Sequence, residues 1–478
     1  MSEGEDNRPA WGKKLSNYVP VPQRFIVAAM GFLSIINNYT LRNSINVTIT
    51  RLVIARNYTN ETTSGVCPKE EDDSGQSTEA LGGEYDWSQE MQGYIIGSFY
   101  IGYILGHVPA GLLSERYGAK WVLVGGMAAS TIITLITPLS IDHLGPIALI
   151  ILRTIQGFGS GASYPSCSAL LAQWVPVHER SLLGAFMMGG GQMGTVVSNS
   201  ISGALLRYTT WRWVFYTFTI MAALWIFFFI IMCFSDPESH PYIRDKEKDY
   251  LMLHMGRLGR NHNQPPFPWV AVFKSKEIWS LIGAQIAHDW GFYVMLTYFP
   301  KFLNDVLQLK IMKTGFYSSI PFLVFWFASL GFGAIASWVI KKNINHATMI
   351  RKIMTFIGAT PSGIFMVIAV YVGCNTIIII FCFSVSMGLM GGFYAGIKLS
   401  ANDLAPNYAA TIMAIVNGIG SITGVLAPYS TGWITGDTTM KEWRAVFWLA
   451  LLILTLPTIP FCIWGSAEIQ DWNEPKRD

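Results

Sequence analysis

Charged side chains are scarce in this sequence. Asp, Glu, Lys and Arg together make up 13% of its 478 residues, whereas soluble globular proteins average about 25%. Hydrophobic residues reach 51%, and the mean hydropathy is +0.36. These values exclude an ordinary soluble domain and indicate a polytopic membrane protein. The net charge of +3 implies little by itself, and no nucleic acid is predicted as a partner.

Signatures of catalysis and metal binding are missing. The six cysteines show no CxxC spacing, so no metal site is predicted. There is no HExxH pair, no nucleophile elbow and no phosphate-binding P-loop, and no sizeable soluble domain that could bind a second substrate. The sequence therefore predicts neither an enzyme nor a bound cofactor.

Long apolar segments recur along the whole chain. Each contains about 20 residues, enough to cross roughly 30 Å of hydrocarbon as a helix. The predicted fold is an all-α membrane protein with twelve transmembrane helices in two six-helix bundles, too many for a seven-helix receptor. The predicted spans are 24–49, 92–113, 121–141, 145–172, 182–206 and 213–234, followed by 277–302, 314–339, 351–372, 376–399, 408–430 and 443–465.

The distribution of charge orients the chain. Residues 51–91 hold nine acidic and three basic residues, whereas four basic and no acidic residues bracket the connection after span eight. Because positive loops stay on the cytoplasmic side, we expect 51–91 outside and both termini in the cytoplasm. The predicted parts are a tail (1–23), a first bundle (24–234), a cytoplasmic linker with a short amphipathic helix (235–276), a second bundle (277–465) and a second tail (466–478).

The outside loop carries two candidate modifications. Asn57 and Asn60 begin Asn-X-Thr triplets, which predict glycosylation. Cys67 and Cys374 both fall outside, where they either form a disulfide or remain two unpaired thiols. Residues 1–22 are polar, so span one is expected to act as a signal anchor and not as a cleavable signal.

Arg42 lies inside span one, one helical turn from Asn38 and from Asn46. A cation at a bilayer centre costs roughly 2.5 to 3.5 kcal/mol on insertion scales, so its position predicts an anion pathway. Arg153 in span four and Lys398 in span ten are predicted to assist as further anion contacts. For Lys398 the alternative is snorkelling towards the cytoplasmic surface.

The stretch GLLSERYGAK, from Gly111 to Lys120, joins spans two and three. It resembles the loop signature of the major facilitator superfamily, in which this loop is expected to stabilise one access state. Under that resemblance Glu115 and Arg116 pair locally or with neighbouring helix ends as the halves rock. The predicted gating residues are Gly111, Glu115, Arg116, Gly118 and Lys120.

Six further stretches are YTLR at 39–42, GSFYIGYILGHVPAG at 97–111, WVPVHERS at 174–181, DWGFY at 289–293, NDLAPNYA at 402–409 and AEIQDW at 467–472. They resemble the anion transporter family of sialin, the vesicular glutamate transporters and the type I sodium-phosphate cotransporters. Within that family, AHDWGFY at 287–293 and GIKLSANDLAPNYAATIMAIVNGIG at 396–420 look most like the arthropod inorganic phosphate cotransporters. The resemblance implies a secondary transporter of small anions. In addition, RTIQG at 153–157 resembles a second signature of the major facilitator superfamily.

The sequence departs from the family at the residues linked to proton coupling. Sialin-like members carry a glutamate and a histidine in span four, but here Gln156 or Ser160 and Ser168 occupy those positions. Three other titratable residues at membrane depth are therefore candidates for coupling, namely His288, Asp289 and His107.

The coupling ion is left open between Na+ and a proton. Asp289 shares a helix face with Gln285 and Tyr293, and Tyr293 is a further candidate for binding the substrate. Oxygen ligands around an acid favour sodium, whereas the neighbouring His288 is typical of proton transfer.

The sequence thus predicts an alternating-access transporter that carries inorganic phosphate or a small organic anion with Na+ or H+. One alternative is a sialin-like H+-coupled transporter of organic acids, and another is a membrane protein that senses anions without transporting them. The predicted partners are the small anion and the lipid bilayer. The absence of an acidic dileucine signal favours the plasma membrane over a lysosomal or vesicular membrane.

Overall fold

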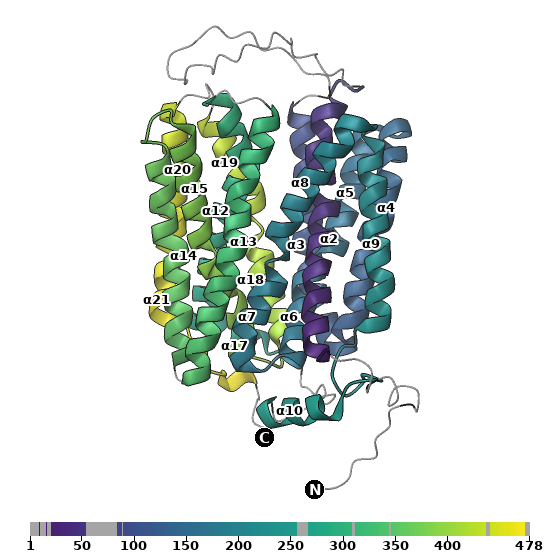
Figure 1. The fold of residues 1–478 in the computed structure, drawn as a ribbon, viewed down its shortest axis with the longest axis vertical. Helices are drawn as coiled ribbons and strands as arrows, with labels where there is room; N and C mark the ends of the chain where they lie inside the picture. Colours follow the sequence, from purple (N-terminus) through teal and green to yellow (C-terminus); the bar gives the residue numbers. More distant parts are fainter. Residues whose placement is uncertain are drawn as a thin grey trace.

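The helices form two bundles that stand side by side (Figure 1). The structure is a computed structural model that describes residues 9, 16, 21–53, 84–87, 89–255, 266–307, 311–343, 346–435 and 440–473. Among these residues the only β pairing is an isolated bridge between Val53 and Tyr85. The fold is therefore all-α, as predicted.

The first bundle contains the helices from residue 23 to residue 232, coloured purple to teal in Figure 1. They are α2 (Gln23–Leu52), α3 (Gln89–Tyr117), α4 (Ala119–His143), α5 (Gly145–Ser160), α6 (Ser163–Trp174), α7 (Val177–Met188), α8 (Gly190–Tyr208) and α9 (Arg212–Met232).

The second bundle contains the helices after residue 275, coloured green to yellow. They are α12 (Lys276–Asp305), α13 (Ile311–Lys342), α14 (Ala347–Ala369), α15 (Thr376–Met390), α16 (Gly392–Ala395), α17 (Ile397–Leu404), α18 (Ala409–Gly420), α19 (Thr423–Ile434), α20 (Met440–Thr455) and α21 (Ile459–Trp464).

Several predicted spans are interrupted helices. Span four is divided into α5 and α6 near Gly161, and span five into α7 and α8 at Gly189. Such a break leaves backbone N–H and C=O groups without a partner in the helix. It is tolerated at membrane depth where neighbouring helices cover these groups. Tight packing surrounds the break in span four, since a Cβ atom at Gly157 would lie 2.0 Å from the carbonyl oxygen of Phe99. The interruptions place short helix ends close to the middle of the bundles.

Nine helices of the described chain are long and apolar enough to cross a membrane. The predicted spans 145–172, 182–206 and 277–302 are not among them, although α5–α6, α7–α8 and α12 occupy these residues. The first two contain many glycine and polar residues, which lower their hydropathy, and α12 carries charged residues at both ends and Asp289 in its middle. The count of twelve spans stays a prediction.

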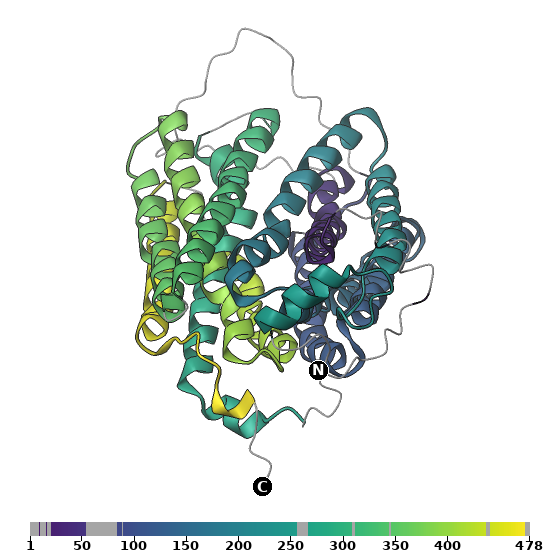
Figure 2. The same ribbon diagram turned by 60° about the horizontal axis from the view of Figure 1, so that its bottom comes forward.

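The linker between the bundles contains two helices, α10 (Asp245–Met255) and α11 (Trp269–Lys274). Figure 2 shows α10 crossing beneath the first bundle. The Glu247 carboxylate accepts hydrogen bonds from the backbone nitrogens of Gln23 at 2.7 Å and Arg24 at 3.1 Å. A carboxylate there satisfies free N–H groups at the start of α2 and interacts favourably with its dipole. We call this end of the molecule the α10 side.

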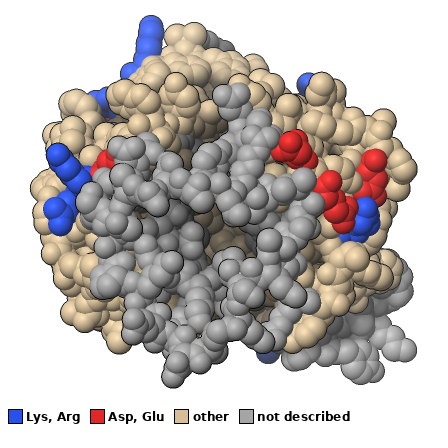
Figure 3. All heavy atoms as spheres, turned by 90° about the horizontal axis from the view of Figure 1, so that it is seen from above, with Lys and Arg blue, Asp and Glu red and all other residues tan. Residues whose placement is uncertain are grey.

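The opposite face is shown in Figure 3, where most described surface is neither acidic nor basic. Arg212 at the start of α9 binds Asp142 at the end of α4, with 2.7 Å between Nη2 and Oδ1. This ion pair is partly exposed, with side-chain exposures of 33% and 23%. It joins two helices of the same bundle and so places no constraint between the bundles.

Candidate substrate site between the bundles

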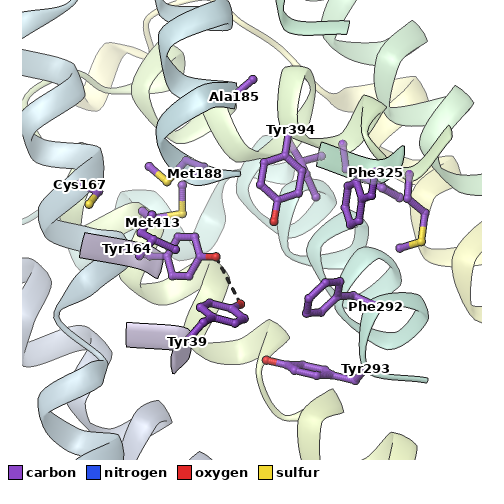
Figure 4. Close-up of a cluster of buried hydrophobic side chains, with 14 of the residues drawn as sticks. Tyr39, Tyr164, Cys167, Ala185, Met188, Phe292, Tyr293, Phe325, Tyr394 and Met413 are labelled. Carbon is purple, nitrogen blue, oxygen red and sulfur yellow. Dashed lines mark hydrogen bonds between the residues drawn. The ribbon is translucent and has the colours of Figure 1, made fainter. Parts of the chain in front are cut away.

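A small cavity lies between the two bundles. Figure 4 shows its aromatic walls: Tyr39 and Tyr164 come from one bundle, whereas Phe292, Tyr293 and Tyr394 come from the other. The hydroxyls of Tyr39 and Tyr164 lie 3.4 Å apart. The cavity is lined by Tyr39, Tyr103, Tyr164, His288, Asp289, Phe292, Tyr293, Tyr394, Lys398 and Asn417.

Arg42 lies beside this cavity and is 3% exposed. Its guanidinium donates a hydrogen bond to the Tyr100 hydroxyl. The guanidinium carbon lies 5.2 Å from the ring centre of Tyr39 and 5.5 Å from that of Tyr293. Within the described part of the chain no carboxylate pairs with Arg42, so aromatic faces stabilise this cation.

Arg153 lies behind Arg42, away from the cavity lining. Its Nη1 donates to the backbone oxygen of Arg42 at 3.2 Å and to Oε1 of Gln156 at 2.7 Å. Gln156 Nε2 in turn donates to the backbone oxygen of Leu41 at 3.2 Å. The structure thus places Arg153 where it fixes the helical turn that carries Arg42, and not where the sequence suggested a direct anion contact.

The two asparagines flanking Arg42 lie in different surroundings. Asn38 Nδ2 donates to Ser163 Oγ at 2.9 Å and to the backbone oxygen of Ser160 at 3.3 Å, and so joins α2 to the break in span four. Oδ1 of Asn46 is buried without a hydrogen-bond partner among the described residues. Neither asparagine lines the cavity, and their binding of substrate stays a prediction.

Lys398 belongs to a charged group from the second bundle. Its Nζ lies 3.8 Å from Oδ1 of Asp289, and the same oxygen lies 2.7 Å from Nδ1 of His288. Lys398 is 2% exposed, so the snorkelling alternative is wrong. A buried carboxylate is costly unless it is paired, and Asp289 here has two nitrogen partners.

His107 reaches this group from the first bundle. Its Nδ1 lies 2.6 Å from the backbone oxygen of Tyr103, and its Nε2 lies 2.8 Å from Nδ2 of Asn417. Asn417 Oδ1 accepts from Lys398 Nζ at 3.2 Å. The sequence did not predict a role for Asn417. The one feature that could have indicated it is an amide side chain within the apolar segment of span eleven.

On the α10 side the bundles are joined directly. Both carboxylate oxygens of Glu115 accept from Thr411, one from its backbone nitrogen and one from Oγ1, at 2.7 Å each. Gly111 allows this approach, because a Cβ atom there would lie 2.9 Å from Cα of Thr411. Arg116 does not pair with Glu115 but lies over the ring of Tyr117.

The other two predicted gating residues act within the first bundle. Gly118 precedes α4 with φ of 94°, a left-handed conformation that favours glycine. Lys120 Nζ donates to the backbone oxygen of Ile230 at 2.7 Å and lies 3.8 Å from the ring centre of Phe234. Both residues fix the turn that presents Glu115 to the second bundle.

A buried ionic cluster lies on the same side. Asp403 Oδ1 lies 3.3 Å from Arg180 Nη1, and its Oδ2 lies 2.9 Å from Arg351 Nε. Arg351 Nη1 also donates to Ser181 Oγ at 2.9 Å. Arg180 and Ser181 belong to α7 of the first bundle, whereas Asp403 and Arg351 belong to the second. This cluster and the Glu115 contact join the two bundles on the α10 side.

The predicted modifications fall mainly on residues that the structure does not describe. Asn57, Asn60 and Cys67 lie outside the described residues. Cys374 is disulfide-bonded, and its pairing with Cys67 stays a prediction. Across the described ranges no group of three or more His, Cys, Asp or Glu side chains could hold a metal ion.

Comparison with known proteins identifies the family. The model of the Major Facilitator Superfamily matches residues 30–428. The chain belongs to this superfamily. Within it, the chain is similar to the "Putative inorganic phosphate cotransporter" of Drosophila melanogaster, with 32% identity over 95% of this chain and 87% of that protein.

Two human relatives place the chain in the same anion transporter family. Sialin is 31% identical over 94% of this chain and 90% of that protein. Vesicular glutamate transporter 2 is 29% identical over 95% of this chain and 76% of that protein. The family resemblance inferred from the sequence motifs is therefore confirmed, and the chain is a transporter and not an enzyme.

A solved structure shows the same fold. The proton:xylose symporter XylE bound to 6-bromo-6-deoxy-D-glucose matches with a TM-score of 0.69 at 15% identity, over 94% of this chain and 98% of that one. This likeness confirms the predicted major facilitator fold, which supports alternating access between two bundles.

Proposed function

We propose that this transporter carries a small anion together with protons. The observation that supports the anion is Arg42, a buried cation beside the cavity between the bundles, with no carboxylate partner in the described chain. Desolvating a charge is costly, and an anionic substrate would supply the missing counter-charge. The cavity is closed on the α10 side by Glu115 and the Asp403 cluster.

Arg42 and Lys398 approach the cavity from opposite bundles. Arg42 donates from α2, and Lys398 lies on α17 with its Nζ 5.4 Å from the ring centre of Tyr164. An anion between them would hold the two bundles together while it is bound. Tyrosine hydroxyls from both bundles offer further donors to its oxygens. Inorganic phosphate and small organic acids both meet these requirements.

The surroundings of Asp289 favour a proton over Na+. Its Oδ1 faces two nitrogen atoms, Nδ1 of His288 and Nζ of Lys398. Hard cations bind several oxygen ligands, and an ammonium group in that position repels a second cation. A histidine beside a carboxylate, in contrast, is a common arrangement for accepting and releasing protons.

Exchange of labelled anions in proteoliposomes tests the anion site without an imposed gradient. Vesicles loaded with unlabelled phosphate, N-acetylneuraminate or glutamate are diluted into the same labelled anion. We expect exchange of at least one of the three, and at least a tenfold loss with Arg42→Met because the cation is removed. Arg212→Met, at the exposed ion pair with Asp142, is the matched control and should exchange normally. Normal exchange by Arg42→Met, at the rate of the control, would exclude Arg42 as the anion contact.

The orientation rests on the charge pattern and the compartment on the missing acidic dileucine signal, and both stay proposals. The α10 side carries the linker that is predicted to be cytoplasmic, so the structure would be closed towards the cytoplasm. The plasma membrane is favoured, with lysosomal or vesicular membranes as the alternatives.

A further inference from the structure

Asn417 connects two ionisable residues that belong to different bundles. Its Oδ1 accepts from Lys398 Nζ at 3.2 Å on the second-bundle side, and its Nδ2 lies 2.8 Å from Nε2 of His107 on α3. Asn417 is 4% exposed, whereas His107 is fully buried. The side-chain amide is therefore the link between a histidine of one bundle and the charged group of the other.

The chemistry of an amide fixes its orientation here. An asparagine side chain has one oxygen that accepts and one nitrogen that only donates. Lys398 can only donate, so the oxygen of Asn417 must face it. Gln285 Nε2 donates to the same oxygen at 3.4 Å. The nitrogen of Asn417 is consequently turned towards His107.

This orientation selects one form of His107. Nδ1 lies 2.6 Å from a backbone carbonyl oxygen, that of Tyr103, and must carry a hydrogen to donate to it. Nε2 faces an N–H donor and must therefore accept. Only the neutral ring with its hydrogen on Nδ1 satisfies both contacts.

We propose that Asn417 is a positioning residue through which protonation of His107 releases Lys398. A protonated His107 has an N–H at Nε2 and so needs the amide oxygen. Lys398 needs the same oxygen, and the amide can serve only one of them. When His107 takes the proton, the amide turns, its nitrogen faces Lys398, and Lys398 loses its bond to α18. This inference rests on the proposed function, because the released ammonium becomes available to the anion.

Other groups surround these three residues. Asn417 Nδ2 also donates to the Tyr103 hydroxyl at 3.4 Å, and Lys398 Nζ lies 3.8 Å from Asp289 Oδ1. The charged groups that act on His107 are Asp289 from α12 and Lys398 from α17. Tyr103 of its own helix packs against the ring, with 4.2 Å between ring centres. A Cβ atom at Gly161, at the break in span four, would lie 3.1 Å from the backbone nitrogen of His107. In the opposite direction, an anion that attracts Lys398 away from Asn417 frees the amide oxygen and favours protonation of His107, as linkage requires.

A double-mutant cycle on substrate-free protein tests the competition. The full-length protein is labelled with 13C at histidine Cε1, and the His107 resonance is assigned by its loss in His107→Gln. The measured quantity is the pH at which His107 is half protonated, in the parent, Lys398→Met, Asn417→Leu and the double variant. Gaining or losing a hydrogen bond to a charged group changes an equilibrium constant by about tenfold or more. We therefore expect Lys398→Met to raise the proton affinity of His107 at least about tenfold when Asn417 is present, and much less with Asn417→Leu.

Two results would overturn the inference. Equal effects of Lys398→Met in both backgrounds would mean that Lys398 acts on His107 directly through space. A His107 that stays unprotonated at every pH at which the protein remains folded would mean that no competition occurs. Asn417→Ser provides the same cycle if Asn417→Leu does not fold.

A transport measurement separates this inference from the proposed function. Exchange of phosphate, N-acetylneuraminate or glutamate is followed from pH 5 to pH 8. The parent should exchange faster at acid pH, His107→Gln should lose that response, and the exposed His143→Gln should keep it. An unchanged pH profile in His107→Gln would contradict the inference. If the parent exchanges none of the three anions, the proposed function fails, and the histidine titration still decides the role of Asn417.

Discussion

Glu115 binds Thr411 through both of its carboxylate oxygens, and the two residues belong to different bundles. Thr411 lies in the first turn of α18, where backbone N–H groups have no partner within the helix. The contact thus combines two hydrogen bonds with a favourable charge at a helix N-terminus. If the bundles alternate in access, we expect this contact to break when the α10 side opens.

Substitution of Glu115 should therefore bias the transporter towards the state that is open on the α10 side. Glu115→Ala removes both hydrogen bonds, and we expect anion exchange to fall several-fold while the amount of protein at the surface is unchanged. Arg116→Ala is the neighbouring control and should have the smaller effect, since Arg116 does not contact the second bundle in the described structure. Normal exchange by Glu115→Ala would show that this contact does not limit transport.

The Asp403 cluster should contribute to stability as well as to closure. Asp403→Asn removes the carboxylate that Arg180 and Arg351 share, and breaking a buried ion pair costs about 3–5 kcal/mol. We expect a marked decrease in the melting temperature of the purified protein. The matched control is Asp142→Asn, which removes a partly exposed ion pair worth at most about 1 kcal/mol. A decrease no larger than that of the control would contradict a closed, buried cluster.

His240, in the linker after α9, should make the fold sensitive to acid. It is fully buried against Phe234 and Tyr242, and burial lowers its pKa from 6.5 to about 4. Between these values the unfolded chain binds a proton that the folded chain does not, so stability decreases as the pH falls. The loss of melting temperature between pH 7.5 and pH 5 should be smaller in His240→Phe. His254 is exposed, and His254→Gln should behave like the parent. If the melting temperature of His240→Phe decreases as much as that of the parent, His240 is not the origin of the acid sensitivity.

The predicted outside loop can be tested by its modifications. A glycosidase should increase the electrophoretic mobility of the protein expressed in animal cells, and Asn57→Gln combined with Asn60→Gln should abolish that shift. The number of thiols that react after denaturation should rise by two on reduction if Cys67 and Cys374 are bonded. An unmodified loop would place residues 51–91 on the cytoplasmic side and reverse the proposed orientation.

Much of the architecture followed from the sequence because bilayer physics restricts it strongly. Apolar length predicted the spans, and the membrane cation Arg42 predicted an anion site, which the structure places beside the cavity between the bundles. His288, Asp289, Tyr293 and Lys398 were also predicted, and the structure brings them to the same cavity. Each of these residues is conspicuous alone, as an ionisable or polar group within an apolar segment.

The roles that depend on partners could not be read in the same way. Arg153 was expected to contact the anion, but its guanidinium donates to Gln156 Oε1 at 2.7 Å and to the backbone oxygen of Arg42 in α2 at 3.2 Å. No side-chain pattern reveals the second contact. Asn417 has its decisive contact with His107, 310 positions away in the sequence. The partner of Glu115 is likewise a helix terminus of the other bundle. Such contacts arise from the packing of two bundles, and periodicity within one helix does not encode them.

The central claim is that a proton gradient drives an anion past Arg42. The most direct measurement is uptake of labelled phosphate, N-acetylneuraminate and glutamate into proteoliposomes under an imposed proton gradient, with choline in place of Na+. The account predicts that at least one anion accumulates above its external concentration and that Arg42→Met abolishes this accumulation. Accumulation that requires Na+, or that persists in Arg42→Met, would contradict it.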